Sequence, residues 1–189
     1  MNTFSQAILQ FAKLDTESLN ELLAITKRHE FPKGHVLLQR NSICNHFYFI
    51  EKGLTRTFYI KDGKDITDWI STEGTFAVSL ISFITRKPDR RTIELLEPSV
   101  LYAISYDDIE ALCKQRHDVE HLIREIVSFG LVQLQRKFDE LHFSTAKQRY
   151  KNLIETNPTI IQRVPLGMVA SFLGMTPETL SRIRSQITF

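Results

Sequence analysis

Residues 166–183 read LGMVASFLGMTPETLSRI, and this stretch decides how the C-terminal part of the chain folds. A helix-turn-helix needs a small residue where its two helices cross, and Ala170 supplies one. Four residues later, Gly174 suits the left-handed backbone conformation that the turn requires. Leu180 and Ile183 are spaced to share the face that packs on the first helix. The stretch therefore predicts a helix-turn-helix, the commonest architecture for reading DNA.

The second helix of this motif has a clear start and a polar outer face. Thr176 is a natural N-cap, and Pro177 suits the first helical position. Glu178, Ser181 and Arg182 are the exposed candidates for base contacts. A Glu can accept from cytosine N4, and an Arg can donate to guanine O6 and N7. Two other interpretations stay open: Glu178 as a favourable anion beside the helix dipole, and Arg182 as a phosphate contact.

The charge of the chain is divided unevenly. Residues 142–189 hold six Lys/Arg and two Asp/Glu, which leaves 18 and 20 of the chain's 24 and 22 for residues 1–141. A small basic segment on a slightly acidic body favours binding of a polyanion, although six cations can also be a solvated surface. Lys147, Arg149 and Arg184 are the candidates for phosphate contacts.

Residues 118–141 form a proline-free stretch that predicts one long helix. Apolar residues and one glycine recur along it every three or four positions, as expected of a seam where two helices pack. The seam consists of Ile123, Val127, Gly130, Leu134, Phe138 and Leu141. The alternative is packing against the chain's own β domain, but Leu122, Ile126 and Phe129 offer a second face for that. We therefore expect a homodimer.

The middle of the chain is rich in short β-type segments. Residues 1–30 are helical in pattern, and a turn at residues 32–34 opens the β region. Lys61-Asp62-Gly63-Lys64 is a hairpin signal between two of its strands. Closely spaced strands and turns, with no long helix before about residue 106, predict an antiparallel sandwich or barrel. The expected strands lie near residues 35–38, 46–50, 54–60, 65–71, 92–96 and 100–104.

Bulk properties indicate a soluble cytoplasmic protein. The 189 residues are 42% hydrophobic and 24% charged, which is ordinary for a globular domain. No apolar run reaches the length of a membrane span, and the N-terminus lacks the pattern of a signal peptide. Cys44 and Cys113 are too few for a cysteine-ligated iron–sulfur cluster, so no cofactor and no metal is expected.

Taken together, the chain resembles the CRP/FNR family of bacterial transcription regulators, in a short branch of the Bacteroidetes type. The segments that carry the resemblance are PKG at 32–34, FYFIEKG at 47–53, GTF at 74–76, ISY at 104–106 and ETLSR at 178–182. The resemblance implies an α+β chain with a jelly-roll-like antiparallel β-roll flanked by helices. The implied domains are a sensor β-roll over 1–117, a dimerisation helix over 118–141 and a helix-turn-helix domain over 142–189.

The same resemblance implies a function and partners. The chain would bind double-stranded DNA as a homodimer on an inverted repeat, with half-sites related to TTGA(T/C). Glu178, Ser181 and Arg182 match the E-x-x-S-R pattern of such recognition helices. RNA polymerase is a further candidate partner, the small-molecule effector is unknown, and no membrane is involved.

Three departures from the family pattern qualify the resemblance. Phe76 is followed by Ala77-Val78-Ser79-Leu80, so the Gly and the ribose-reading Glu of a cyclic-AMP receptor are both missing, and Asp89 lies nearest the expected phosphate-reading Arg. The effector pocket is expected at Phe76, Ser79, Arg90 and Arg91 and is not expected to bind cyclic AMP. Residues 1–30 contain no Cys for an oxygen-sensing cluster. The family's β-hairpin wing after the recognition helix is expected to be missing.

Two competing interpretations remain. Cys44, His46 and Glu51 loosely resemble a cupin metal motif, but residues 52–116 contain no His to complete it, so an enzyme is not expected. The second is a sensory or protein-interaction module whose DNA-binding part has degenerated. Such a module would not need to keep Glu178 and Arg182, and both are present.

Overall fold

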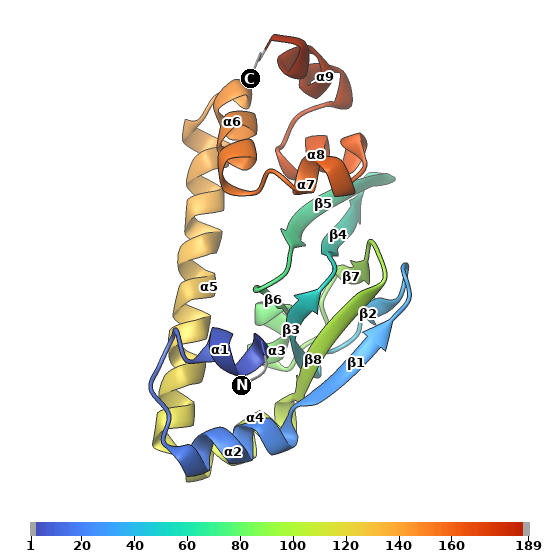
Figure 1. Ribbon diagram of the computed structural model, residues 1–189. Coiled ribbons are helices and arrows are strands. Elements are labelled where there is room, and N and C mark those ends of the chain that lie inside the picture. Colours follow the sequence, from blue (N-terminus) through green and yellow to red (C-terminus); the bar gives the residue numbers. More distant parts are fainter. Residues whose placement is uncertain (1–2, 187–189) are drawn as a thin grey trace. The chain divides into compact units, whose positions relative to one another are not determined.

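The computed structural model describes residues 3–186 (Figure 1). Contacts divide the chain into two compact units. The first contains the described residues up to Thr57 together with Ile70–Gly130. The second contains Phe58–Trp69 and the residues from Leu131 onward. The tip of one β-hairpin is therefore part of the same unit as the C-terminal helices, although more than 60 residues separate them in the sequence.

Eight strands form two four-stranded sheets, with the orders β1-β8-β3-β6 and β2-β7-β4-β5. Strand β8 pairs antiparallel with both β1 and β3, β3 pairs antiparallel with β6, and β2 with β7. The strands are β1 (Lys27–Phe31), β2 (Val36–Leu38), β3 (His46–Lys52), β4 (Thr55–Lys61), β5 (Lys64–Ser71), β6 (Phe76–Ala77), β7 (Thr92–Leu95) and β8 (Ser99–Ser105). The expected antiparallel β-roll is confirmed.

Helices flank these strands and make up the C-terminal part of the chain. They are α1 (Thr3–Ile8), α2 (Thr16–Ile25), α3 (Leu80–Thr85), α4 (Tyr106–Gln115), α5 (His117–Phe143), α6 (Ala146–Thr156), α7 (Ile160–Arg163), α8 (Leu166–Phe172) and α9 (Pro177–Gln186). Asp15 caps α2 by accepting from the Ser18 backbone N–H at 2.7 Å. None of the described helices is both long and apolar enough to span a membrane.

The β4–β5 hairpin follows its sequence signal, whereas β1 does not. Asp62 and Gly63 have φ angles of 52° and 74°, which is the type I′ geometry that an Asp-Gly pair favours. Strand β1 has the sequence KRHEF, and its first four residues are exposed. Because it is the outer strand of its sheet, it lacks the apolar alternation that would reveal a strand in the sequence.

The core of the first unit is dominated by aromatic side chains. Phe4 packs on Phe49 and Tyr102, with ring centroids 5.7 and 5.6 Å apart. Phe76 packs on Phe47 and Phe49 at 4.9 and 5.5 Å. The rings come from helix α1 and strands β3, β6 and β8, so α1 closes one side of the β-roll core.

Helix α5 buries one face and exposes another. Val119, Leu122 and Ile126 are almost fully buried in the core of the first unit. Leu134 and Phe138, which lie further along, are 48% and 54% exposed. The expected inner face is thus occupied at Leu122 and Ile126, while the predicted dimer seam leaves apolar surface on the outside of the chain.

Candidate nucleic-acid interface

Helices α8 and α9, where the helix-turn-helix is expected, pack on each other across a turn and have their own small core. Val169, Ala170, Leu173, Leu180 and Ile183 are all at least 93% buried. Ala170 and Leu180 have no exposed surface at all, as expected where two helices cross closely. The turn between the helices has Gly174 at a φ of 64°, the left-handed conformation predicted for it.

Helix α9 starts as its sequence suggests. Thr176 accepts from the Thr179 backbone N–H at 3.2 Å, which is an N-cap bond, and Pro177 is the first helical residue. The backbone N–H of Glu178 itself, followed by the hydroxyl of Thr176, lowers the pKa of the Glu178 carboxyl. The carboxylate is therefore held ionised at the helix start, where it can accept from a base.

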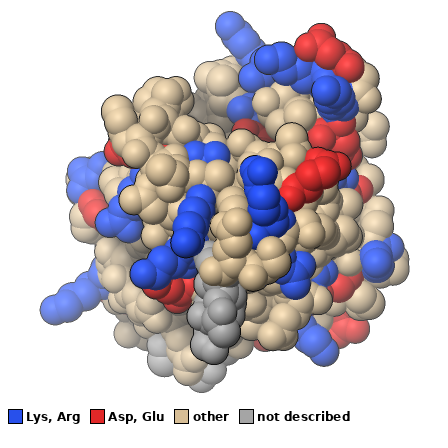
Figure 2. Space-filling view, turned by 90° about the horizontal axis from the view of Figure 1, so that it is seen from above, with Lys and Arg blue, Asp and Glu red and all other residues tan. Residues whose placement is uncertain are grey.

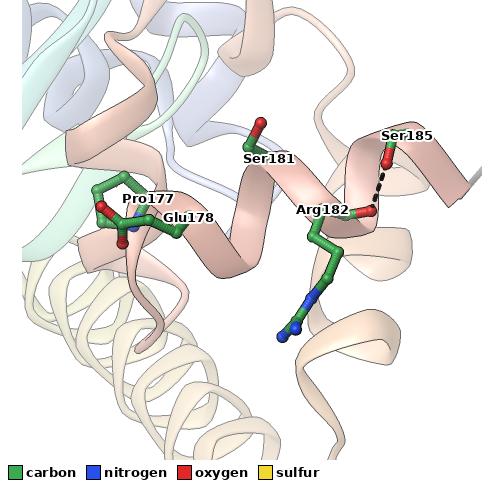
Figure 3. Close-up of a pocket in the computed structure, with 5 residues that line it drawn as sticks. All are labelled: Pro177, Glu178, Ser181, Arg182 and Ser185. Carbon is green, nitrogen blue, oxygen red and sulfur yellow. Dashed lines mark hydrogen bonds between the residues drawn. The ribbon is translucent and has the colours of Figure 1, made fainter.

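One face of α9 is open to solvent and polar. Pro177, Glu178, Ser181, Arg182 and Ser185 line an open hollow of about 630 Å³ (Figure 3). Figure 3 shows the Arg182 side chain extending away from the helix, while the Ser185 hydroxyl donates to the Arg182 carbonyl at 2.8 Å. The three predicted base-reading residues are thus all exposed on one helix, and the guanidinium of Arg182 projects outward.

The three predicted phosphate contacts have different surroundings. Lys147 on α6 and Arg184 in the last turn of α9 are exposed. Arg149 is half-buried and donates to three backbone carbonyls: Nε to Leu173 at 2.7 Å, Nη1 to Ser144 at 2.6 Å and Nη2 to Gly174 at 3.4 Å. Since these carbonyls occupy the guanidinium, the geometry favours a structural role for Arg149 and leaves Lys147 and Arg184 for phosphates.

On the face shown in Figure 2, Lys and Arg side chains are spread out, with Asp and Glu between them. That distribution suits contacts to individual phosphates along a groove.

The residues of the predicted effector pocket interact with the chain's own groups. Ser79 caps α3, and its hydroxyl also donates to the carboxyl of Asp89, with both residues at least 95% buried. Arg91 pairs with Asp89 at 3.3 Å, and Arg90 is exposed. Phe76 packs in the aromatic core. A buried acidic side chain thus lies in the region where the family pattern would have a phosphate-reading Arg.

The residues of the cupin-like motif have separate roles. The thiol of Cys44 is buried and contacts the His46 carbonyl at 3.4 Å, and burial raises the pKa of this thiol. Glu51 pairs with Arg28 at 2.9 Å. Within residues 3–186, no three His, Cys, Asp or Glu side chains are grouped so that they could hold a metal ion.

Sequence reasoning overlooked two residues beside the helix-turn-helix. Lys137 on α5 donates to the Phe172 carbonyl at 2.6 Å, and Thr67 of the hairpin is 97% buried. The Thr67 backbone N–H donates to the Ser171 hydroxyl at 2.9 Å. Lys137 could have been found from the sequence, because it lies between Leu134 and Phe138 of the apolar seam. A cation in such surroundings needs a hydrogen-bond or ionic partner. Nothing local in the sequence marks Thr67.

Known proteins show the same fold. Residues 28–116 match the family model of the cyclic nucleotide-binding domain. FixK2 from Bradyrhizobium japonicum is 14% identical over 86% of this chain and 84% of its own, with a TM-score of 0.73. The regulator CLP from Xanthomonas campestris is 17% identical over 91% of each chain, with a TM-score of 0.67.

A transcriptional regulator of the CRP/FNR family from Eubacterium rectale is 18% identical over 92% of this chain and 83% of its own, with a TM-score of 0.70. No curated protein sequence matches the chain. These structural matches extend well beyond the β-roll and include the helical C-terminal part. Residues 28–116 thus match the cyclic nucleotide-binding domain, and the chain as a whole has the fold seen in FixK2 and in the solved CRP/FNR-family regulator.

Proposed function

We propose that the protein is a sequence-specific DNA-binding regulator of transcription that acts as a homodimer on an inverted repeat. The observation that carries this proposal is the division of α9 into two faces. Leu180 and Ile183 are buried, whereas Glu178, Ser181 and Arg182 are exposed. An exposed Glu and Arg near the start of the second helix are what base readout in the major groove requires. The similar structures are regulators rather than enzymes.

The proposed dimer interface is the exposed apolar face of α5. Two helix-turn-helix units must lie about 34 Å apart to read two half-sites of a palindrome. Leu134, Phe138 and Leu141 are 39–54% exposed, which is unusual for large apolar side chains spaced along one helix. Burying this face against a second copy removes the patch from water and fixes the spacing of the two DNA-reading units.

Helix α3 carries further exposed apolar side chains, within the first unit. Ile81 and Ile84 are 61% and 56% exposed. A methyl group added at Gly130 of α5 would lie 3.2 Å from Leu80 Cδ1, so the two helices touch at this point. Ile81 and Ile84 are therefore candidates for separate dimer contacts made by the first unit.

The proposed regulator does not respond to cyclic AMP. Binding the cyclic phosphate would bring its negative charge toward the buried Asp89 carboxyl and would disrupt its bond with Ser79. A structural relative from Xanthomonas campestris is named as responsive to c-di-GMP, so this fold accommodates other signals. The effector of the present chain therefore differs in chemistry from a nucleotide held through a phosphate-reading arginine.

A binding-site selection on randomised duplex DNA tests the proposal, with two variants of one helix as a matched pair. Arg182→Ala and Arg184→Ala remove the same group from exposed positions two residues apart. Arg182→Ala should weaken the best site by about 1–3 kcal/mol and relax the preference at one base pair. Arg184→Ala should weaken all sequences alike and reduce the salt dependence.

Three outcomes would contradict parts of the proposal. If the wild-type protein enriches no sequence, the helix-turn-helix does not read DNA and the chain is a sensory or interaction module. If Arg182→Ala keeps the full wild-type preference, base readout depends on other residues. A single species of about 22 kDa in solution at tens of micromolar would contradict the homodimer.

A further inference from the structure

The C-terminal end of α8, where the helix-turn-helix turns, has its backbone carbonyls fully occupied. The last four carbonyls of any α-helix have no partner inside the helix. Here the Met175 N–H donates to the Ala170 carbonyl and the Gly174 N–H to the Ser171 carbonyl, each at 3.0 Å. These two bonds form a Schellman motif, which satisfies half of the set.

Cations from two other helices satisfy the remaining two carbonyls. Lys137 Nζ of α5 donates to the Phe172 carbonyl at 2.6 Å, and Arg149 Nε of α6 donates to the Leu173 carbonyl at 2.7 Å. Arg149 also donates to Ser144, the residue that follows α5, at 2.6 Å. The turn is therefore attached to both α5 and α6 through hydrogen bonds from the side chains of Lys137 and Arg149.

The Lys137 amine also lies over an aromatic ring. Its Nζ lies 3.0 Å from the centroid of the Phe172 ring, and Trp69 of β5 packs edge-on against the same ring at 6.4 Å. The Thr67 N–H of the hairpin donates to Ser171 on α8. Lys137, Phe172 and Trp69 thus form one cluster that joins α5, α8 and the hairpin tip within the second unit.

We propose that Lys137 is a positioning residue for DNA binding: by holding the Phe172 carbonyl, it fixes the turn of the helix-turn-helix relative to α5. The inference rests on the proposed function, because it concerns how the DNA-reading helix is held. Arg149 does the same from α6. Lys137 differs from Arg149 in one respect, since a lysine can lose its charge in a buried site and an arginine cannot.

The charge of Lys137 depends on pH in the neutral range. Burial lowers the pKa of its amine from 10.5 to about 7, against the opposing effect of Asp68 on β5 and Glu140 on α5, while Arg149 on α6 lowers it further. When Lys137 leaves Phe172 and Trp69 and becomes exposed to water, which we call the open cluster, its amine regains its ordinary pKa and binds a proton more readily. The closed cluster is therefore favoured as the pH rises above about 7 and is weakened as the pH falls through that value.

Trp69 provides a readout of the cluster that does not involve DNA. It is the single Trp of the chain, so the emission reports on the surroundings of this one side chain, which include the Phe172 ring. The emission of the wild-type protein should change between pH 5.5 and 8.5 with a midpoint of about 7. Lys137→Met, which is apolar and similar in length, should abolish the change.

Two further variants complete the design. Lys137→Arg keeps a permanent charge and should hold the emission at the wild-type acid value throughout. Lys151→Met makes the same change as Lys137→Met at an exposed α6 position, where Lys151 is 3.7 Å from Glu155. This control retains His142 of α5, which stacks on Phe138, and it should keep the wild-type profile.

DNA affinity is measured over the same pH range, on the sequence selected by the wild-type protein. We expect wild-type affinity to fall on acidification and Lys137→Arg to stay at the wild-type acid level. Lys137→Met should bind about tenfold more weakly at pH 8, with the pH dependence lost, because the bond to the Phe172 carbonyl is absent. Lys151→Met should follow the wild-type curve.

The outcomes separate this inference from the proposed function. If the emission and affinity profiles of Lys137→Met equal those of the wild type, another group titrates and the inference is wrong, while DNA binding stands. A wild-type emission that stays flat across the range also overturns it. If the wild type binds no DNA, the proposed function fails and the positioning role fails with it, even if the emission still titrates.

Discussion

Gly174 and Gly167 should respond to the same substitution with opposite signs. Gly174 has a φ of 64° at the turn between α8 and α9, whereas Gly167 lies within α8 and its backbone conformation is not left-handed. An alanine in the left-handed region costs about 1–2 kcal/mol. Its methyl group at position 174 would also lie 2.9 Å from Leu141 Cδ2, which can move aside at small cost.

At position 167, alanine is expected to stabilise the fold rather than destabilise it. A methyl group there meets nothing within 4 Å, and alanine is the better helix former by about 0.5–1 kcal/mol. Gly174→Ala should therefore lower the free energy of unfolding by about 1–2 kcal/mol, and Gly167→Ala should raise it by about 0.5–1 kcal/mol. The two variants should differ by about 2 kcal/mol although each adds one methyl group.

Urea unfolding followed by circular dichroism measures both values, and Trp69 emission in the same samples reports on the second unit. Gly174→Ala should also reduce DNA affinity, because the turn sets the direction of α9. Equal midpoints for the two variants, or a more stable Gly174→Ala, would refute the role assigned to the left-handed turn.

Four further experiments have expected outcomes. Thr67→Val should stabilise the protein by about 1 kcal/mol in urea unfolding, because the Thr67 hydroxyl is buried without a partner among the described residues; a loss of stability would contradict this. Arg149→Met should cost about 1.5–3 kcal/mol by the same measurement, since it leaves the Leu173 and Ser144 carbonyls unpaired, whereas Lys151→Met should be near neutral. Phe138→Glu should give a monomer in light scattering, and an unchanged dimer would place the interface elsewhere. Titration calorimetry with cyclic AMP should show no binding at micromolar concentrations, and binding would overturn the inhibitory role of Asp89.

The sequence predicts the parts of this fold whose patterns are local. The two helices expected for the helix-turn-helix, the Asp-Gly hairpin and the long helix each follow from spacing within one segment, and the structure has these elements at 166–186, 55–71 and 117–143. Strand β1 escapes prediction because it is charged and lies at a sheet edge. Its pairing with β8 depends on residues about 70 positions away.

In the candidate site, too, local patterns predict some residues, whereas others depend on contacts that are distant in the sequence. Glu178, Ser181 and Arg182 are exposed as the helical period predicts. Arg149 looked like a phosphate contact because its charge is visible in the sequence, whereas its three carbonyl partners become visible only in the fold. Lys137 and Thr67 escaped notice for the same reason: their partners on α8 are 35 and 104 residues away in the sequence. Expectations about a missing wing concern the stretch after Gln186, outside the described residues.

The hairpin tip has a consequence for how the chain is made. Residues 58–69 leave the ribosome long before α8 and α9, yet they pack in one compact unit with those helices. Since synthesis runs from the N-terminus at about 5–20 residues per second, the tip waits several seconds with Trp69 and Thr67 uncovered. Contacts of such long sequence separation also form slowly. The second unit can therefore complete its folding only once the last helices have been translated, so a nascent chain truncated before α8 should remain open to proteolysis at the hairpin.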